Sequence, residues 1–267
     1  MIEALKKKMS NYEPITDKEM RFMLQNIGHV NPEIRDDLIY GLFCIGLEKE
    51  MFSIHQVKEI IRYLSENNLL FQGLEDGMIE STLRRSFTAL IWALLLYFDD
   101  KENSVYFRLL SQKQRENVFE MSIEHLSKER DATGYLKPYG WVHTIAHSSE
   151  LLLRAVCHSM FQKGLAEPVL NSVASMFMKQ ENVFSDREEK RVGLVLLEML
   201  ERKKLSVSQF KKWIEQMAKH YDTEKLLETK DFRSKENVVN MLNYVLLYME
   251  EPMARELREN IKQLNSF

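Results

Sequence analysis

The chain has 267 residues, of which 45% are hydrophobic and 29% charged, and its formal net charge is −3. The chain contains only 9 Gly and 5 Pro but 15 Met, and this scarcity of turn residues favours helices over strands. A general nucleic-acid binder is normally basic, because phosphate contacts supply most of its affinity, so the acidic balance makes nucleic acid an unlikely partner.

The compartment follows from the cysteines and the apolar runs. Cys44 and Cys157 are too few for a disulfide framework, and both lie in apolar helical runs, where free cysteine behaves as a small buried hydrophobe. The first eight residues contain no apolar signal region. The longest apolar run, about 89–98, is half the length that a membrane span needs. We therefore expect a cytoplasmic, soluble protein without a membrane partner.

Apolar periodicity and helix-start signals predict a series of helices through the first half of the chain. Pro32 and the preceding Asn31 open one of these helices, and Ser111-x-x-Gln114 is a capping box that opens another. The segment 80–97 is apolar over much of its circumference, which is typical of a central helix. The predicted helices cover about 1–10, 17–26, 33–45, 54–67, 80–97 and 111–128.

The second half of the chain shows the same apolar periodicity and helix-start signals. Pro138 is expected in the first turn of a helix that runs to about Gln162, and Pro168 opens the next helix, to about Lys179. Ser185-x-x-Glu188 and Ser206-x-x-Gln209 read as capping boxes before two further helices. Ser234 is expected to cap the helix that follows, and Pro252 to separate it from a last helix ending near Leu264.

Eleven or twelve helices with short connections, and no segment of convincing strand alternation, predict an all-α fold. The first choice of architecture is an α-solenoid of degenerate HEAT/ARM-like helix pairs, although no repeat is visible at the residue level. A compact helical bundle is the runner-up. No segment resembles a linker, so residues 1–267 are expected to form a single all-helical domain.

The central predicted helix is two-sided. Apolar residues such as Val142, Ile145 and Leu152 gather on one side at about 100° per residue. The opposite side collects a polar stripe of His143, His147, Glu150, Arg154 and His158.

Two short blocks of the sequence, at 85–90 and 129–151, are distinctive in their residues. The block 129–151 contains Glu-Arg-Asp at 129–131, Gly-Tyr at 134–135 and Gly-Trp-Val-His-x-x-Ala-His-x-x-Glu-Leu at 140–151. It resembles the signature of a bacterial all-helical family of unknown function, and Arg-Ser-Phe-Thr-Ala-Leu at 85–90 resembles that family's second block. The resemblance implies a helical fold and a region in which to look for a site, and it implies no particular chemistry.

Three interpretations of the histidines stay open. His143 and His147 lie one turn apart and could share a divalent metal with Glu150 as third ligand, although Thr144 stands where a His-Glu-x-x-His protease has its glutamate. Alternatively, both rings are core-edge groups hydrogen-bonded to the preceding loop, with Asp131, Tyr135 and Tyr139 as partners. The third interpretation is a stripe that lines a groove for a ligand.

The sequence thus favours a binding or interaction module that uses a groove around residues 131–158. Its partner would be a protein, a peptide or a small molecule, and no cofactor is required. The alternative function is a metal-dependent hydrolase that uses His143, His147 and Glu150. Catalytic residues cannot be named, and the candidate ligand- or partner-binding residues are Asp131, Tyr135, Trp141, His143, His147, Glu150 and Arg154.

Overall fold

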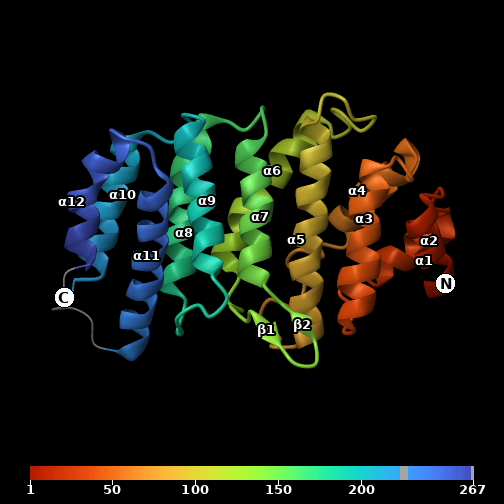
Figure 1. The fold of residues 1–267 in the computed structure, drawn as a ribbon, viewed down its shortest axis with the longest axis horizontal. Coiled ribbons are helices and arrows are strands. Elements are labelled where there is room, and N and C mark those ends of the chain that lie inside the picture. The colour runs from red at the N-terminus through yellow and green to blue at the C-terminus, as the bar shows by residue number, and fades with distance from the viewer. Residues whose placement is uncertain (223–227, 266–267) are drawn as a thin grey trace.

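The computed structural model describes residues 1–222 and 228–265, and over these ranges the protein is all-α with one two-residue hairpin. The helices stand side by side in approximate chain order along the long axis of the molecule (Figure 1). They are α1 Ile2–Asn11, α2 Asp17–Gln25, the π-helix η1 Glu33–Tyr40, α3 Gly41–Glu48, α4 Ile54–Glu66, α5 Ile79–Asp100, α6 Gln112–Lys128, α7 Thr144–Cys157, the short 3₁₀-helix η2 Lys163–Leu165, α8 Ala166–Met178, α9 Glu188–Glu201, α10 Val207–His220, α11 Thr229–Tyr248 and α12 Met253–Asn265.

Helices two places apart in the chain pack against one another. In one layer α5 packs on α7, α7 on α9 and α9 on α11. In the other layer α6 packs on α8 and α8 on α10, while α6 also contacts α7 and α8 contacts α11. Helix α7 therefore lies in the middle of the molecule, between α5 and α9 (Figure 1).

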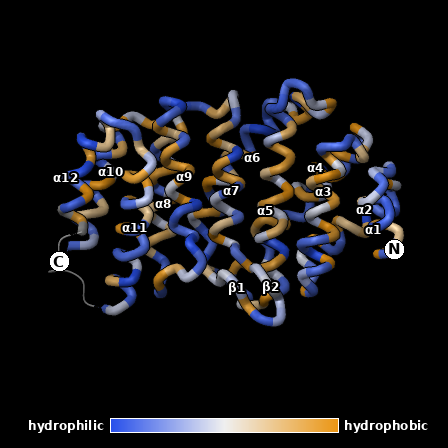
Figure 2. Tube along the Cα trace, in the orientation of Figure 1, coloured by the Kyte–Doolittle hydropathy of each residue, from blue (hydrophilic) through white to orange (hydrophobic). Residues whose placement is uncertain are grey.

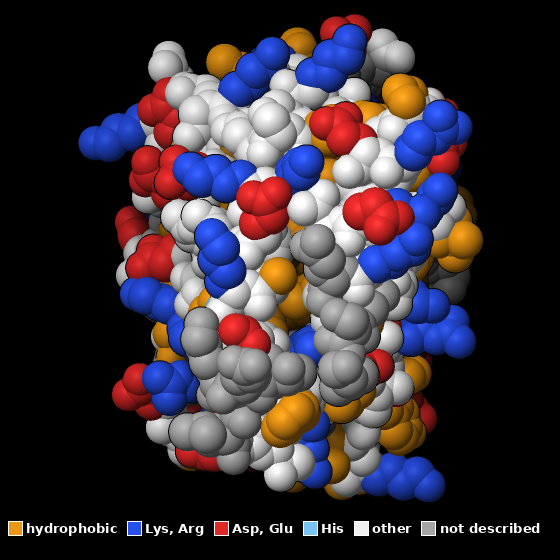
Figure 3. Space-filling view, turned by 90° about the vertical axis from the view of Figure 1, so that its left-hand side faces the viewer, with side chains coloured by type: hydrophobic (Ala, Val, Ile, Leu, Met, Phe, Trp, Pro, Cys, Tyr) orange, Lys and Arg blue, Asp and Glu red, His pale blue; other side chains and the backbone are white. Residues whose placement is uncertain are grey.

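The buried apolar side chains form one cluster that extends from Leu5 to Leu264. Hydrophobic residues recur along the helices and hydrophilic ones dominate the connections, as amphipathic helices require (Figure 2). At the end of the molecule that carries α10 and α12, basic and acidic side chains are interspersed and the exposed hydrophobic ones gather in small patches (Figure 3). Among the described residues, no helix is both long enough and apolar enough to cross a membrane.

Most predicted helices in the first half are confirmed within about two residues. The capping boxes at Ser111 and Ser206 form as expected, each side chain accepting from the backbone N–H three residues on. The helix expected from Pro32 is present, but its first two turns are a π-helix and only 41–48 are α-helical.

Two predicted caps are wrong. Arg187, and not Ser185, occupies the N-cap of α9, in a left-handed conformation at φ 67° and without a side-chain cap. Ser234 lies inside α11, where its hydroxyl donates to the Phe177 carbonyl and meets the Tyr221 hydroxyl at 2.6 Å. Since serine also bonds well within a packed core, the residue type alone did not mark the helix start.

The central segment differs most from expectation. Pro138 follows a cis peptide bond in a hairpin turn, and it does not open a helix. Strands β1 Tyr135–Leu136 and β2 Gly140–Trp141 pair antiparallel, with Tyr135 opposite Trp141. Helix α7 starts six residues after Pro138 and ends at Cys157, before the expected end at about Gln162.

Candidate functional site

The hairpin 135–141 is held against the N-terminal part of the chain by one buried guanidinium. Arg35, which is fully buried in η1, donates from Nη2 to the carbonyl oxygens of Tyr139 at 2.8 Å and Trp141 at 3.2 Å. Gly140 has φ +75°, and a Cβ there would lie 3.0 Å from the Cβ of Pro32. Glycine is thus required both by the backbone conformation and by the close approach of η1.

His143 is placed by the backbone at the first turn of α7. Its N–H donates to the Thr133 carbonyl at 2.9 Å, and its own carbonyl accepts from the His147 N–H at 2.8 Å. The residue is left-handed, at φ 48°, an uncommon conformation outside glycine and asparagine. Surrounding contacts must impose it, and such local strain is concentrated at functional sites.

His147 joins α7 to α5 through a serine. The Ser86 hydroxyl lies against both the Val142 carbonyl and the Nδ1 of His147, the second at 2.7 Å. A hydroxyl has one proton, and the carbonyl can only accept it, so Nδ1 of His147 must carry the proton that it shares with Ser86. The lone pair of His147 is therefore on Nε2. Burial, reinforced by the nearby His143, Arg191 and Arg35, lowers the pKa of His147 to about 3, which keeps the ring neutral.

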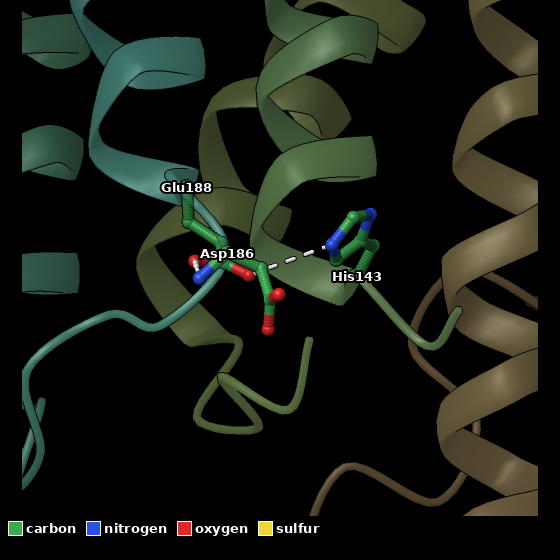
Figure 4. A group of neighbouring side chains, drawn as sticks. All are labelled: His143, Asp186 and Glu188. Carbon is green, nitrogen blue, oxygen red and sulfur yellow. Dashed lines mark hydrogen bonds and ion pairs between the residues drawn. The ribbon is translucent and has the colours of Figure 1, made fainter. Parts of the chain in front are cut away.

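Two carboxylates from the start of α9 complete the surroundings of His143 (Figure 4). The Nε2 atom of His143 lies 3.7 Å from Oε1 of Glu188, too far for a hydrogen bond. Asp186 accepts from the Ser185 hydroxyl at 2.7 Å and from the Tyr135 N–H at 3.3 Å. Ligand atoms of His143, Asp186 and Glu188 all lie within 4.8 Å of one another.

The approach of Asp186 depends on a glycine in the hairpin arm, the segment 130–134 that leads into the hairpin. A Cβ on Gly134 would lie 1.8 Å from Oδ2 and 2.5 Å from Cγ of Asp186, so the Asp186 side chain could not keep its position. The acidic group therefore reaches His143 because residue 134 has no side chain.

Burial sets the charge states of this group. It lowers the pKa of His143, against the pull of Asp186, so that the imidazole is neutral near pH 7. It raises the pKa of Glu188, whose side chain is 1% exposed. His143 Nε2 and Glu188 Oε1 are both buried without a hydrogen-bond partner in the described structure, which costs about 1–3 kcal/mol for each group. One imidazole and two carboxylates are a donor set that suits a divalent transition metal.

The predicted stripe is not one surface. Glu150 and Arg154 pair with each other at 2.7 Å and line a separate cavity of about 250 Å³ with Tyr40 and Tyr97. His158 caps the far end of α7, is 1% exposed, and lies 3.2 Å from Oδ2 of Asp99. The prediction that His158 shares a helix face with the other four residues is therefore wrong, because the helix ends one residue earlier, at Cys157.

Two loop residues from the candidate binding set, Asp131 and Trp141, take different roles near the histidines. Asp131 accepts from the Thr82 hydroxyl at 3.0 Å and from the Thr133 N–H at 2.9 Å, so it braces the hairpin arm and is not bonded to a histidine. Trp141 is 44% exposed and packs its ring on that of His143 at 4.4 Å, with Tyr135 on its other side at 5.0 Å. Trp141 is thus a half-exposed aromatic beside the buried polar group.

A cavity of about 650 Å³ opens beside the hairpin arm. Gly134, Tyr135 and Ser185 line it, and these residues also surround Asp186. Three cationic side chains face it against one acidic side chain. Burial, together with Arg130 and Lys128, lowers the pKa of one of them, Lys179, as expected where positive charges crowd. The lining residues are Arg130, Ala132, Thr133, Gly134, Tyr135, Met178, Lys179, Gln180, Glu181, Asn182, Val183, Ser185 and Lys230.

Sequence reasoning missed Arg35, Ser86, Asp186 and Glu188, all of which contact the histidine region from other elements. Asp186 and Glu188 had been read as parts of an ordinary helix start. The available signal was the resemblance to a two-block family, because Ser86 lies in the block 85–90 and its partner His147 lies in the block 129–151.

A family model described as protein of unknown function, DUF2785, matches residues 70–247, about two thirds of the chain. Both blocks and all three members of the His143 group fall within this range. No similar curated protein and no similar solved structure was found.

Proposed function

Because the chain belongs to the DUF2785 family, whose function is unknown, no activity can be transferred to it, and we propose from the geometry that it is a binding module for an anionic ligand. The ligand would carry carboxylate or phosphate groups and occupy the cavity lined by 130–135 and 178–185. The hairpin 135–141 forms one rim of this site.

The observation that carries the proposal is the charge of the cavity. Arg130, Lys179 and Lys230 line it, and Glu181 is the acidic residue among its lining side chains. Lys230 is paired with Glu228, which leaves Arg130 and Lys179 as the main sources of positive potential. The volume of about 650 Å³ lies in the range of small-molecule and peptide sites. The exposed rings of Tyr135 and Trp141 add an apolar contact next to the charges, as in many recognition surfaces.

The proposal extends to the architecture. We take the helix pairs to be degenerate HEAT/ARM-like repeats in a single domain, working in the cytoplasm. Packing between helices two places apart supports this view, since each repeat of a solenoid contacts its neighbours in that manner. A solenoid places its loops and inner helices along one extended face, which is where such proteins bind their partners.

The test is isothermal titration of the protein with three probes: inorganic phosphate, pyrophosphate and a hexaglutamate peptide. Buffers contain EDTA, so that no metal contributes. We expect at least one probe to bind with a dissociation constant below about 1 mM, and the double variant R130Q/K179Q to weaken it tenfold or more. A response to phosphates alone identifies a phosphoryl ligand, and a response to hexaglutamate identifies an acidic peptide.

The matched control is K211Q/K212Q, which makes the same change in net charge on α10, away from the cavity. It should bind as the unaltered protein does. If both double variants lose affinity equally, the effect is one of overall charge and the cavity is not the site. Absence of binding by all three probes would also contradict the proposal.

A further inference from the structure

We infer that His143, Asp186 and Glu188 form a binding site for a divalent transition metal, with zinc the ion that suits the ligands best. The inference goes beyond the proposed anion site and does not depend on it. Figure 4 shows the side chains of His143 and Glu188 pointing toward each other from two different elements, with Asp186 beside them.

The donor atoms are close enough to share one ion. The ligand atoms around a tetrahedral zinc ion lie about 3.3 Å apart when each bond is about 2.0 Å long. Nε2 of His143 and Oε1 of Glu188 are separated by 3.7 Å, and all three ligand atoms lie within 4.8 Å of one another. Movements of side chains by a fraction of an ångström to about one ångström therefore suffice, without rearrangement of the backbone.

The decisive observation is that the inward-facing atoms have no partners. Glu188 is 1% exposed and its Oε1 atom, which faces His143, accepts no hydrogen bond in the described structure. His143 Nε2 is in the same condition. Buried polar atoms nearly always have a hydrogen-bond partner, and a bound ion is one of the standard reasons for an exception.

An ion pair between the two residues does not explain the arrangement. At 3.7 Å the contact is longer than a hydrogen bond, and metals bind the neutral form of an imidazole. Two carboxylates and a neutral imidazole would balance the charge of a divalent cation. The opposing charge that acts on His143 is that of Arg191, which is exposed.

The supporting contacts resemble those that orient metal ligands elsewhere. The other oxygen of Glu188 accepts the Asp186 N–H at 3.1 Å, and Asp186 is bonded to Ser185 and to the Tyr135 backbone. The ring of Trp141 packs on His143 and restricts its rotation. Three protein ligands leave at least one coordination position for water or a ligand.

The experiment uses full-length protein made without a polyhistidine tag and stripped with EDTA, which is then removed by dialysis. Titration with zinc chloride should show one equivalent bound with a micromolar or lower dissociation constant, and zinc should raise the melting temperature. Glu188→Gln preserves shape but removes the charge, and should weaken zinc at least tenfold.

The matched control is Glu189→Gln, which alters the neighbouring carboxylate in the same helical turn, outside the group. It should bind zinc as the unaltered protein does. His143→Asn provides a second test, because asparagine tolerates the left-handed backbone, and it too should weaken zinc binding. The inference is overturned if the unaltered protein shows no saturable zinc binding, if neither Glu188→Gln nor His143→Asn weakens it, or if Glu189→Gln weakens it as much.

Discussion

The ion pair between Arg85 and Glu129 should be one of the most sensitive points of the fold. The two side chains are 2% and 0% exposed and meet through two hydrogen bonds, of 2.8 and 3.1 Å. Glu129 also accepts the N–H groups of Arg130 and Asp131, each at 3.0 Å, and so fixes the exit of the chain from α6. Arg85 holds the loop before α5 through the carbonyls of Gln72 and Gly73.

Glu129→Gln would leave the guanidinium buried without a counter-charge. Removal of one partner of a buried ion pair costs about 3–5 kcal/mol. At roughly 2–4 °C for each kcal/mol in a chain of this size, the melting temperature should fall by roughly 6–20 °C. Thermal unfolding followed by circular dichroism measures the shift.

Glu124→Gln is the matched control, on the same helix. Glu124 pairs with Lys128 at the surface, where both side chains are about half exposed, and such a pair contributes about 0–1 kcal/mol. If Glu129→Gln melts within the error of Glu124→Gln, the buried pair does not stabilise the fold, and the account of how α5 and α6 are joined is incorrect.

Two further predictions concern α7 and α6. Ile145→Asp should unfold the protein, because residue 145 is fully buried between helices and the carboxylate would have no partner. His147→Ala removes one hydrogen bond to Ser86 and a ring contact with Phe87, and it should leave a cooperative thermal transition. Equal losses of stability in the two variants, measured by circular dichroism, would contradict this difference. Burial lowers the pKa of His125 from 6.5 to about 4, so below pH 6.5 the unfolded chain takes up the proton first and stability falls as the pH is lowered toward 4. Denaturant titrations should give a free energy of unfolding about 2 kcal/mol smaller at pH 5 than at pH 7 from this group, and His125→Gln should reduce that pH dependence.

The regular helices could be predicted from the sequence because their signals are local. Ser111 and Ser206 lie three residues before a glutamine and directly before an apolar period, and both caps form. Ser185 shows a similar pattern but is not used, because Asp186 is drawn toward Gly134 and the helix begins only after the left-handed Arg187. A long-range contact overrides the local signal there.

The hairpin and the His143 group could not be predicted for a related reason. The sequence around Pro138 is compatible with a helix start, and the hairpin is held by Arg35, more than a hundred residues earlier in the chain, which bonds the carbonyls of Tyr139 and Trp141. Periodicity placed His143 and His147 on one helix face, but it could not show that Glu188 of α9 and Asp186 of the preceding loop lie beside His143. When the side chains of a site come from separate elements, their spacing along a single sequence follows no rule that would identify the site.

The two blocks that resemble a family signature gain a physical meaning from the contacts between them. Arg85 of the block 85–90 bonds Glu129 of the block 129–151, and Ser86 bonds His147. These contacts join α5 and α6 to the arm that carries Gly134, and the arm in turn positions His143 against Asp186. Residues that serve only stability would not need to end in a buried imidazole and a buried carboxylate without partners. The same framework therefore explains why the helices of the central region pack as they do and why an unpartnered imidazole nitrogen and an unpartnered carboxylate oxygen face each other at its end.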